Sequence, residues 1–215
     1  FISKSSILTS LPLSLNKFQI TCRVSKTSMT FLNEKFSDLK GHFEQPSFIY
    51  ILSYIKKHNI EKGKYICFIV RTADYYQSAN KTEREKVFSY RNVNEKNYIP
   101  SLEYLIKNDY KIIRMGKGIK NKFPYENKNF IDYSLSNDRS DFLDIWLSAH
   151  CKFFFHSSTG IGVIPMLFNV PILSTEQTLA LRSLTWIPKS ITLFRKINKK
   201  DKSLNIKDML NKGLH

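Results

Sequence analysis

The sequence has no long apolar run and few cysteines, and each absence removes a class of protein. No stretch reaches the roughly 20 apolar residues of a membrane-spanning helix, and the first residues lack the charged, apolar and small-residue order of a secretory signal peptide. The cysteines Cys22, Cys67 and Cys151 have no metal-ligand spacing and are an odd number, which fits a reducing cytosol. We expect a cytoplasmic protein that touches a membrane, if at all, peripherally at its inner face.

The sequence also lacks the motifs of three large enzyme classes. It contains no GxGxxG, no GxxxxGK[ST] and no GxSxG, so dinucleotide-dependent dehydrogenases, P-loop NTPases and hydrolases have no motif to support them. The five histidines are scattered, and no cluster of histidine, cysteine and carboxylate has the spacing of a metal site. We expect neither a bound metal nor a cofactor.

Positive charge is what the chain has in excess. Lysine and arginine number 34 against 18 aspartate and glutamate, a net charge of +16, while 42% hydrophobic residues are enough for a packed core. Such a charge favours anionic partners, whether nucleotides, nucleic acid or an acidic membrane surface. A composition rich in lysine, asparagine and isoleucine can also reflect biased codon usage, so charge alone does not choose among these partners.

Continuous apolar runs alternate with segments of helical periodicity. Runs typical of buried strands occupy residues 65–70, 110–115, 129–133 and 151–155, and a further strand is predicted to begin at residue 172. Apolar residues have helical spacing at 30–39, 46–59, 94–108, 141–150 and 161–168. Asn137 and Asp138 are the predicted capping residues of the segment 141–150. From residue 65 on, this alternation predicts an α/β fold with a Rossmann-like, doubly wound parallel sheet.

We expect three parts in the chain. Residues 1–60 form a partly helical N-terminal segment, residues 61–190 the Rossmann-like domain, and residues 191–215 a basic, partly helical C-terminal tail. Residues 73–94 show no period and read as a long polar loop, and loops of this length are often functional or mobile.

The turn from His156 to Gly160 is the first candidate site. A predicted strand ends here in hydroxyl residues, and a predicted helix starts directly after them. Free backbone N–H groups and the positive end of a helix dipole at such a turn favour a phosphate. Serine and threonine are also the commonest helix caps, so plain capping is the alternative.

Polar residues follow the other predicted strands as well. Arg71 and Thr72 follow the first strand, and Arg114 and Gly116 the second. Ligands of open parallel sheets bind beyond the carboxyl ends of the strands, where arginine forks and close-approaching glycine suit a pyrophosphate. The alternative for each arginine taken alone is an exposed side chain at the end of a strand, with no ligand to bind.

Two residues near this edge could move a proton. Asp74 is the acid beside the predicted site that could accept one, and a solvated loop aspartate is its alternative reading. His156 could act as a base or as a phosphate donor, although a histidine at a strand end is often a local hydrogen-bonding residue.

With these residues in view, the chain resembles the C-terminal half of GT-B-type glycosyltransferases. The similarity is greatest to a bacterial group of glycosyltransferases, and beyond it to fucosyltransferase-like and heptosyltransferase-like enzymes. The segments that carry it are CFIVR at 67–71, IRMG at 113–116, RSDFLDI at 139–145, CKFFF at 151–155 and SSTG at 157–160. They span about residues 64–174. The resemblance implies the C-terminal half of a GT-B architecture.

The resemblance also implies roles for individual residues. In the relatives, the arginine after the first strand and the serine and glycine turn hold the donor diphosphate, which implies that role for Arg71 and for the turn residues Ser157, Ser158, Thr159 and Gly160. The expected activity is metal-independent transfer of a sugar from a nucleotide-sugar donor to a glycan or lipid-linked acceptor, in surface polysaccharide or glycan biosynthesis.

The chain departs from the family at Ile69 and Thr72, where the relatives often carry histidine and aspartate. About sixty residues precede the first strand, too few for a second doubly wound acceptor domain, so we expect donor binding with little transfer. The alternative function is a non-enzymatic basic module that binds nucleic acid or an anionic membrane surface, with nucleic acid the less favoured partner.

Overall fold

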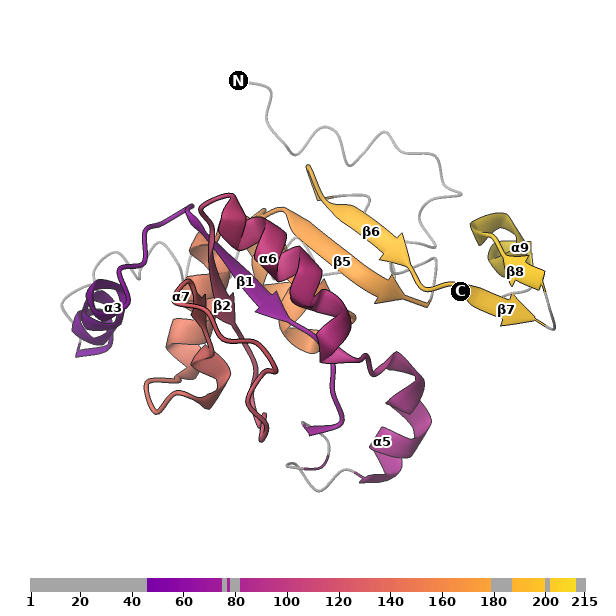
Figure 1. Ribbon diagram of the computed structural model, residues 1–215, viewed down its shortest axis with the longest axis horizontal. Coiled ribbons are helices and arrows are strands. Elements are labelled where there is room, and N and C mark those ends of the chain that lie inside the picture. The colour runs from indigo at the N-terminus through magenta and orange to yellow at the C-terminus, as the bar shows by residue number, and fades with distance from the viewer. Residues whose placement is uncertain (1–45, 75–76, 78–81, 179–186, 200–201, 212–215) are drawn as a thin grey trace, which may run out of the picture. The chain divides into compact units, whose positions relative to one another are not determined.

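The computed structural model describes residues 46–74, 77, 82–178, 187–199 and 202–211 (Figure 1). The chain divides between Tyr50 and Ile51 into two units, and every described strand belongs to the second. The predicted helix at 30–39 and most of the N-terminal segment 1–60 lie outside the described residues.

A six-stranded parallel sheet forms the centre of the second unit. Its strands are β1 (Tyr65–Ile69), β2 (Lys111–Arg114), β3 (Phe130–Ile131), β4 (Phe154–Ser157), β5 (Ile172–Gln177) and β6 (Ile191–Phe194). Their order across the sheet is β3-β2-β1-β4-β5-β6, and each neighbouring pair is parallel. This is the Rossmann order, so the predicted α/β fold is confirmed.

Helices cover both faces of the sheet because its central strands are apolar on both sides. In β1, Cys67 faces a core shared with α3 (Pro46–Lys57), α7 (Asp141–His150) and α8 (Val163–Leu167). Phe68 faces the opposite core with Phe155, against α6 (Ile99–Lys107). Every residue of β1 is buried, which explains its continuous apolar sequence.

Three elements differ from the sequence prediction. The fourth strand begins at Phe154 rather than at residue 151 and continues through His156 and Ser157, which are polar yet buried. The helix predicted at 161–168 is a 3₁₀ turn, η6 (Gly160–Gly162), followed by the five residues of α8, where Pro165 cannot donate to a longer ladder. The third strand has only two residues.

The segment read as a loop contains helices. Residues 73–94 include α5 (Thr82–Phe88) and the 3₁₀ turn η3 (Ser89–Arg91), and a further turn, η4 (Glu95–Tyr98), leads into α6. In Figure 1, α5 lies beyond the arrowhead of β1, on the side where the strands end. This segment therefore approaches the carboxyl edge of the sheet.

The sheet also extends into the predicted C-terminal tail. β6 begins at Ile191 and pairs with β5, so the sheet crosses the predicted boundary at residue 190. Beyond it, β7 (Ile197–Lys199) and β8 (Lys202–Leu204) form an antiparallel pair, and α9 (Ile206–Asn211) follows in the tail that was predicted to be partly helical.

Candidate functional site

The order of strands reverses between β1 and β4, and the ends of these two strands are joined. The Arg71 N–H donates to Ser157 Oγ at 2.8 Å. The Arg71 carbonyl in turn accepts from the Val93 N–H at 3.1 Å. Open parallel sheets bind ligands at such a reversal, because the two crossovers leave it on opposite faces and open a crevice. Arg71 and the turn after β4, which were predicted to meet, do meet.

Arg91 holds the turn after β4 from the segment between β1 and α6. Its guanidinium donates to Ser158 Oγ at 2.7 Å and to the Ser158 carbonyl at 2.5 Å. Ser158 has a φ of 36°, an uncommon value for a residue with a side chain, and is 7% exposed. The sequence analysis missed Arg91, because it lies in the segment without a period. The only available signal was the length of that segment.

The tip of the turn is open. A Cβ placed on Gly160 would meet no atom within 4 Å, and Gly160 is exposed. Thr159 beside it is partly exposed, and its hydroxyl lies 3.2 Å from Nδ1 of His156. The helix that follows is too short for a dipole of the strength expected from the sequence. An anion bound here would therefore depend on the neighbouring cations and on the hydroxyl and N–H groups of the turn.

His156 lies beneath the turn and is closed off from water. Its side chain is 4% exposed, and burial lowers the pKa of its imidazole to about 4. A Cβ on Gly162 would stand 2.6 Å from its Cε1, so the ring fills the space of that missing side chain. Its Nε2 has no hydrogen-bond partner among the described residues. This neutral, buried ring is poorly placed for the catalytic role predicted for it and instead supports the turn.

Arg114 lies at the end of β2, as predicted, but inside the protein. It is 2% exposed, and its guanidinium pairs with Glu95 at 2.6 Å and with Asp132 at 2.8 Å. It also lies over the ring of Phe123, 5.1 Å from the centroid. Two carboxylates already neutralise this cation, so the predicted role of Arg114 in ligand binding is not one that its surroundings favour.

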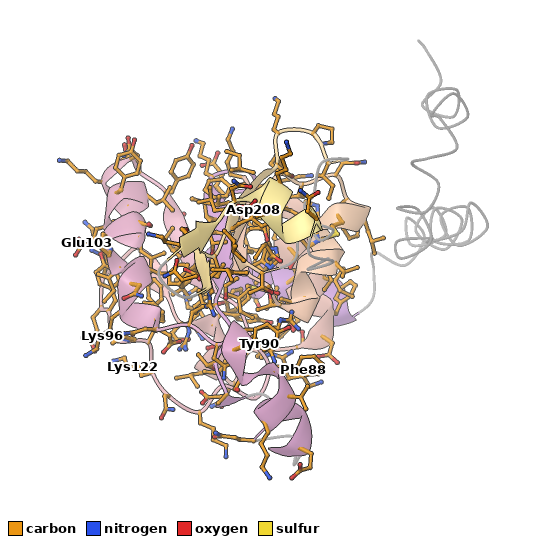
Figure 2. The ribbon with its side chains drawn as sticks, turned by 90° about the vertical axis from the view of Figure 1, so that its right-hand side faces the viewer. Phe88, Tyr90, Lys96, Glu103, Lys122 and Asp208 are labelled. Carbon is orange, nitrogen blue, oxygen red and sulfur yellow. The ribbon has the colours of Figure 1, made fainter. Side chains whose placement is uncertain are left out.

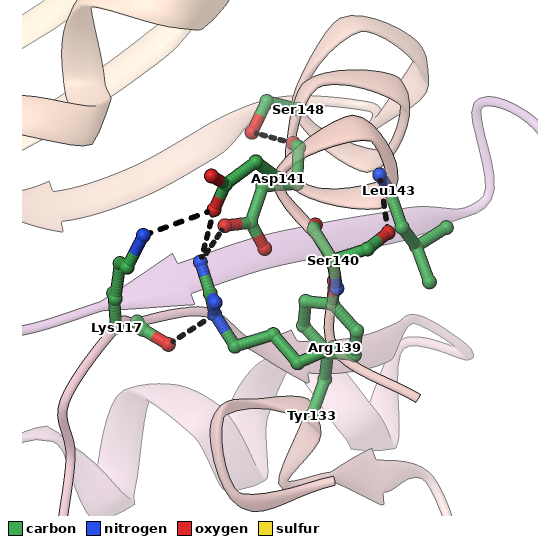
Figure 3. A network of polar contacts seen from close by, with 9 residues as sticks. Lys117, Tyr133, Arg139, Ser140, Asp141, Leu143 and Ser148 are labelled. Carbon is green, nitrogen blue, oxygen red and sulfur yellow. Dashed lines mark hydrogen bonds and ion pairs between the residues drawn. The ribbon is translucent and has the colours of Figure 1, made fainter. Parts of the chain in front are cut away.

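Gly116 follows β2 with a φ of 147°, a conformation that favours glycine. Its carbonyl accepts from Nε of Arg139 at 3.0 Å. Figure 3 shows Arg139 beside Asp141 at the start of α7, and its guanidinium also pairs with Asp144. Ser140 Oγ caps this helix by accepting from the Leu143 N–H at 3.1 Å. The cap is Ser140 rather than the predicted Asn137 and Asp138. Gly116 therefore anchors α7 to the end of β2.

Asp74 and Thr72 are the remaining predicted residues. Asp74 accepts from the Lys120 N–H at 3.2 Å through Oδ2 and is partly exposed. Desolvation is the main cause that raises the pKa of Glu95, and Asp74 adds to it, which indicates that the two carboxylates are neighbours. The Thr72 hydroxyl is buried without a partner in the part of the chain that the structure describes. Asp74 is the carboxylate of the predicted set that remains accessible.

A second arginine that the sequence analysis missed completes the edge beyond β6. Arg195 pairs with Glu176 at 2.5 Å and donates to the carbonyls of Tyr90 and Asn92. Figure 2 shows Tyr90 beside Phe88, the last residue of α5, and Tyr90 lies in η3, the turn that also carries Arg91. Arg91 and Arg195 thus hold this segment against the ends of β4 and β6.

Hollows lie beside the two outer strands of the sheet. One of about 510 Å³ lies beside β3 and is lined by Tyr125 and Phe130 among others. Another of about 530 Å³ lies between Arg195 and Lys207, beyond β6.

Among the described residues, no group of three or more histidine, cysteine, aspartate and glutamate side chains could hold a metal ion. No helix within the described ranges is both long and apolar enough to cross a membrane.

Comparisons of the chain with protein-family models, with curated proteins and with solved structures find no match.

Proposed function

We propose that the chain is the donor-binding domain of a metal-independent glycosyltransferase, with the diphosphate of a nucleotide-sugar held where the strand order reverses. The observation that carries the proposal is the hydrogen bond between the Arg71 N–H and Ser157 Oγ, which brings the predicted arginine and the predicted hydroxyl turn to one point. The exposed Gly160 leaves that point open to a ligand.

The chemistry of these residues suits a leaving diphosphate. When the sugar transfers, negative charge develops on the diphosphate, and positioned donors that cost no reorganisation stabilise it. Arg71 would supply a guanidinium fork, and the Thr159 hydroxyl and the Gly160 N–H would supply neutral donors. Arg91 would act by positioning, because it fixes Ser158 within the turn.

Asp74 is the residue that we assign to the acceptor side. It is partly exposed at the carboxyl edge and could take the proton of an acceptor hydroxyl as the glycosidic bond forms. A glycan or a lipid-linked sugar carries such a hydroxyl. The imidazole of His156 is buried beneath the turn, so we do not assign the proton transfer to it.

Calorimetric titration with UDP-, GDP-, CMP- and ADP-linked sugars tests the proposal. At least one donor should bind, and Arg71→Ala should weaken it by about 1–3 kcal/mol, the usual loss for a charged hydrogen bond. Lys96→Ala is the matched control, because Lys96 is an exposed cation at the same edge (Figure 2). Binding of no donor at millimolar concentration, or equal losses in the two variants, would remove the basis of the proposal.

A further inference from the structure

Five of the six strands of the sheet have a lysine at, or one or two residues before, their first residue. Lys64, Lys128, Lys152 and Lys189 lie one or two residues before β1, β3, β4 and β6, and Lys111 is the first residue of β2. Parallel strands all begin at the same edge of a sheet, so these lysines lie along the amino edge. The candidate donor site occupies the opposite, carboxyl edge.

Hydrogen bonds show that the segments that carry these lysines are neighbours. The Lys152 N–H donates to the Tyr65 carbonyl at 2.7 Å, beside Lys64. The Ile172 N–H donates to Ser190 Oγ at 2.9 Å, beside Lys189. Six strands at a spacing of about 4.8 Å place the row along roughly 24 Å of the edge.

The exposed members of this row, with two lysines from the adjoining turn and helix end, define what we call the lysine edge. Its residues are Lys62, Lys64, Lys107, Lys128, Lys152 and Lys189. Lys111 is not counted, because its ammonium group is taken up by the carbonyls of His58 and Asn59 at 2.5 and 2.7 Å.

Acids on the same connecting segments do not balance this charge. They are Glu61, which pairs with Lys64 at 2.9 Å, Asp109, and Glu126, which pairs with Lys122 outside the lysine edge. The lysine edge therefore keeps a local excess of positive charge, with exposed ammonium groups on its turns.

The chemistry of this edge fits a lipid surface better than a nucleic acid. Its cations are lysines, which are attracted to diffuse negative charge without the fork that reads phosphate and base geometry. Next to Lys189, the edge strand β6 exposes Ile191 by 58% and Leu193 by 52%. Aliphatic side chains beside lysines partition into the headgroup region of a bilayer, whereas single-stranded nucleic acid is bound by aromatic stacking.

We infer that the lysine edge docks this chain on a bilayer that carries anionic lipids, with Ile191 and Leu193 at the level of the headgroups. The strands are up to six residues long, about 20 Å, so the carboxyl edge remains in water when the chain is docked. Docking and binding of a soluble ligand at the carboxyl edge are therefore compatible. The inference is independent of the proposed glycosyltransferase activity.

Co-sedimentation with vesicles tests the inference. The chain should bind vesicles of phosphatidylcholine with 30% phosphatidylserine and not vesicles of phosphatidylcholine alone, and the binding should weaken as salt is raised. The triple variant Lys62→Gln, Lys152→Gln and Lys189→Gln should bind about a hundredfold more weakly, because each lysine near an anionic surface contributes about fivefold.

The matched control removes the same charge elsewhere. Lys86→Gln, Lys96→Gln and Lys207→Gln change three lysines that are exposed away from the amino edge, and this variant should lose less than a few-fold. Equal losses in the two triple variants would show that total charge rather than the lysine edge binds, and absence of vesicle binding would overturn the inference. Tighter binding to oligonucleotides in an anisotropy assay, lost in the first variant alone, would assign the edge to nucleic acid instead.

Discussion

The buried imidazole of His156 makes the stability of the fold depend on pH in a calculable way. Its pKa is about 4 in the folded protein, against about 6.5 in an unfolded chain. Between these values the unfolded chain binds the extra proton, so acid favours unfolding. The stabilisation is fully present above pH 6.5, falls as the pH is lowered through this window, and is gone below about pH 4.

The size of the effect follows from the same two values. A difference of about 2.5 pKa units corresponds to about 3 kcal/mol over the whole window, of which about 2 kcal/mol is lost between pH 7 and pH 5. Other groups also titrate in this range, so the contribution of His156 is obtained by comparison with His156→Gln, which cannot be protonated. The difference in free energy of unfolding between the two proteins should shrink by about 2 kcal/mol from pH 7 to pH 5.

Urea unfolding at pH 7, 6 and 5 measures this difference. His150→Gln is the control, because His150 is partly exposed and stacks on Trp146, and the pKa of His150 is lowered mainly by burial but without the enclosure of His156. Its effect on the pH dependence should be smaller. An NMR titration of the wild-type protein gives a second reading, with the His156 ring still neutral at pH 5. A constant free-energy difference across pH, or a ring that titrates near 6.5, would refute the buried position of His156.

Two further pairs of variants test the packing of the turn and the ion pairs of Arg114. Gly162→Ala should lower the free energy of unfolding by about 1–3 kcal/mol, because the new methyl group would collide with the imidazole of His156. The control Gly160→Ala places its methyl group in open space and should change the free energy of unfolding by less than about 0.5 kcal/mol. Similar values for the two variants in urea unfolding would contradict the packing of the turn. Arg114→Met should cost about 3 kcal/mol, because it leaves Glu95 and Asp132 as unpaired, mostly buried charges, and adding Glu95→Gln should recover part of the loss. A loss below 1 kcal/mol from Arg114→Met would show that these carboxylates are solvated.

The parallel sheet could be predicted because the central strands are apolar on both faces. Helices must then cover both sides, and the alternation of the segments leaves few ways to connect them. The end of β4 could not be placed correctly, since His156 and Ser157 look like the start of a turn. They remain in the strand because the space at Gly162 and the Arg71 N–H accommodate them, and both features are tertiary.

The candidate site was predictable in part for the same reason. Arg71 and the turn after β4 follow adjacent strands, so their meeting follows from the topology. Arg114 also follows a strand, but its ion-pair partners Glu95 and Asp132 lie 19 and 18 residues away in the chain. Nothing in the local pattern indicates that these carboxylates turn inward. Arg91 comes from a segment without periodicity, so its sequence does not indicate which side chains face the sheet.

The central place of β1 has a consequence for how the protein folds. β1 pairs with β2 on one side and with β4 on the other, and β4 pairs with Phe68 and its neighbours across more than 80 residues of sequence. β4 and the strands beyond it therefore have no template until β1 is in place, and such long-range parallel pairing is slow. During synthesis β1 emerges before both of its partners. Until these partners are made, both edges of β1, which has the sequence YICFI, are open to pairing with another chain.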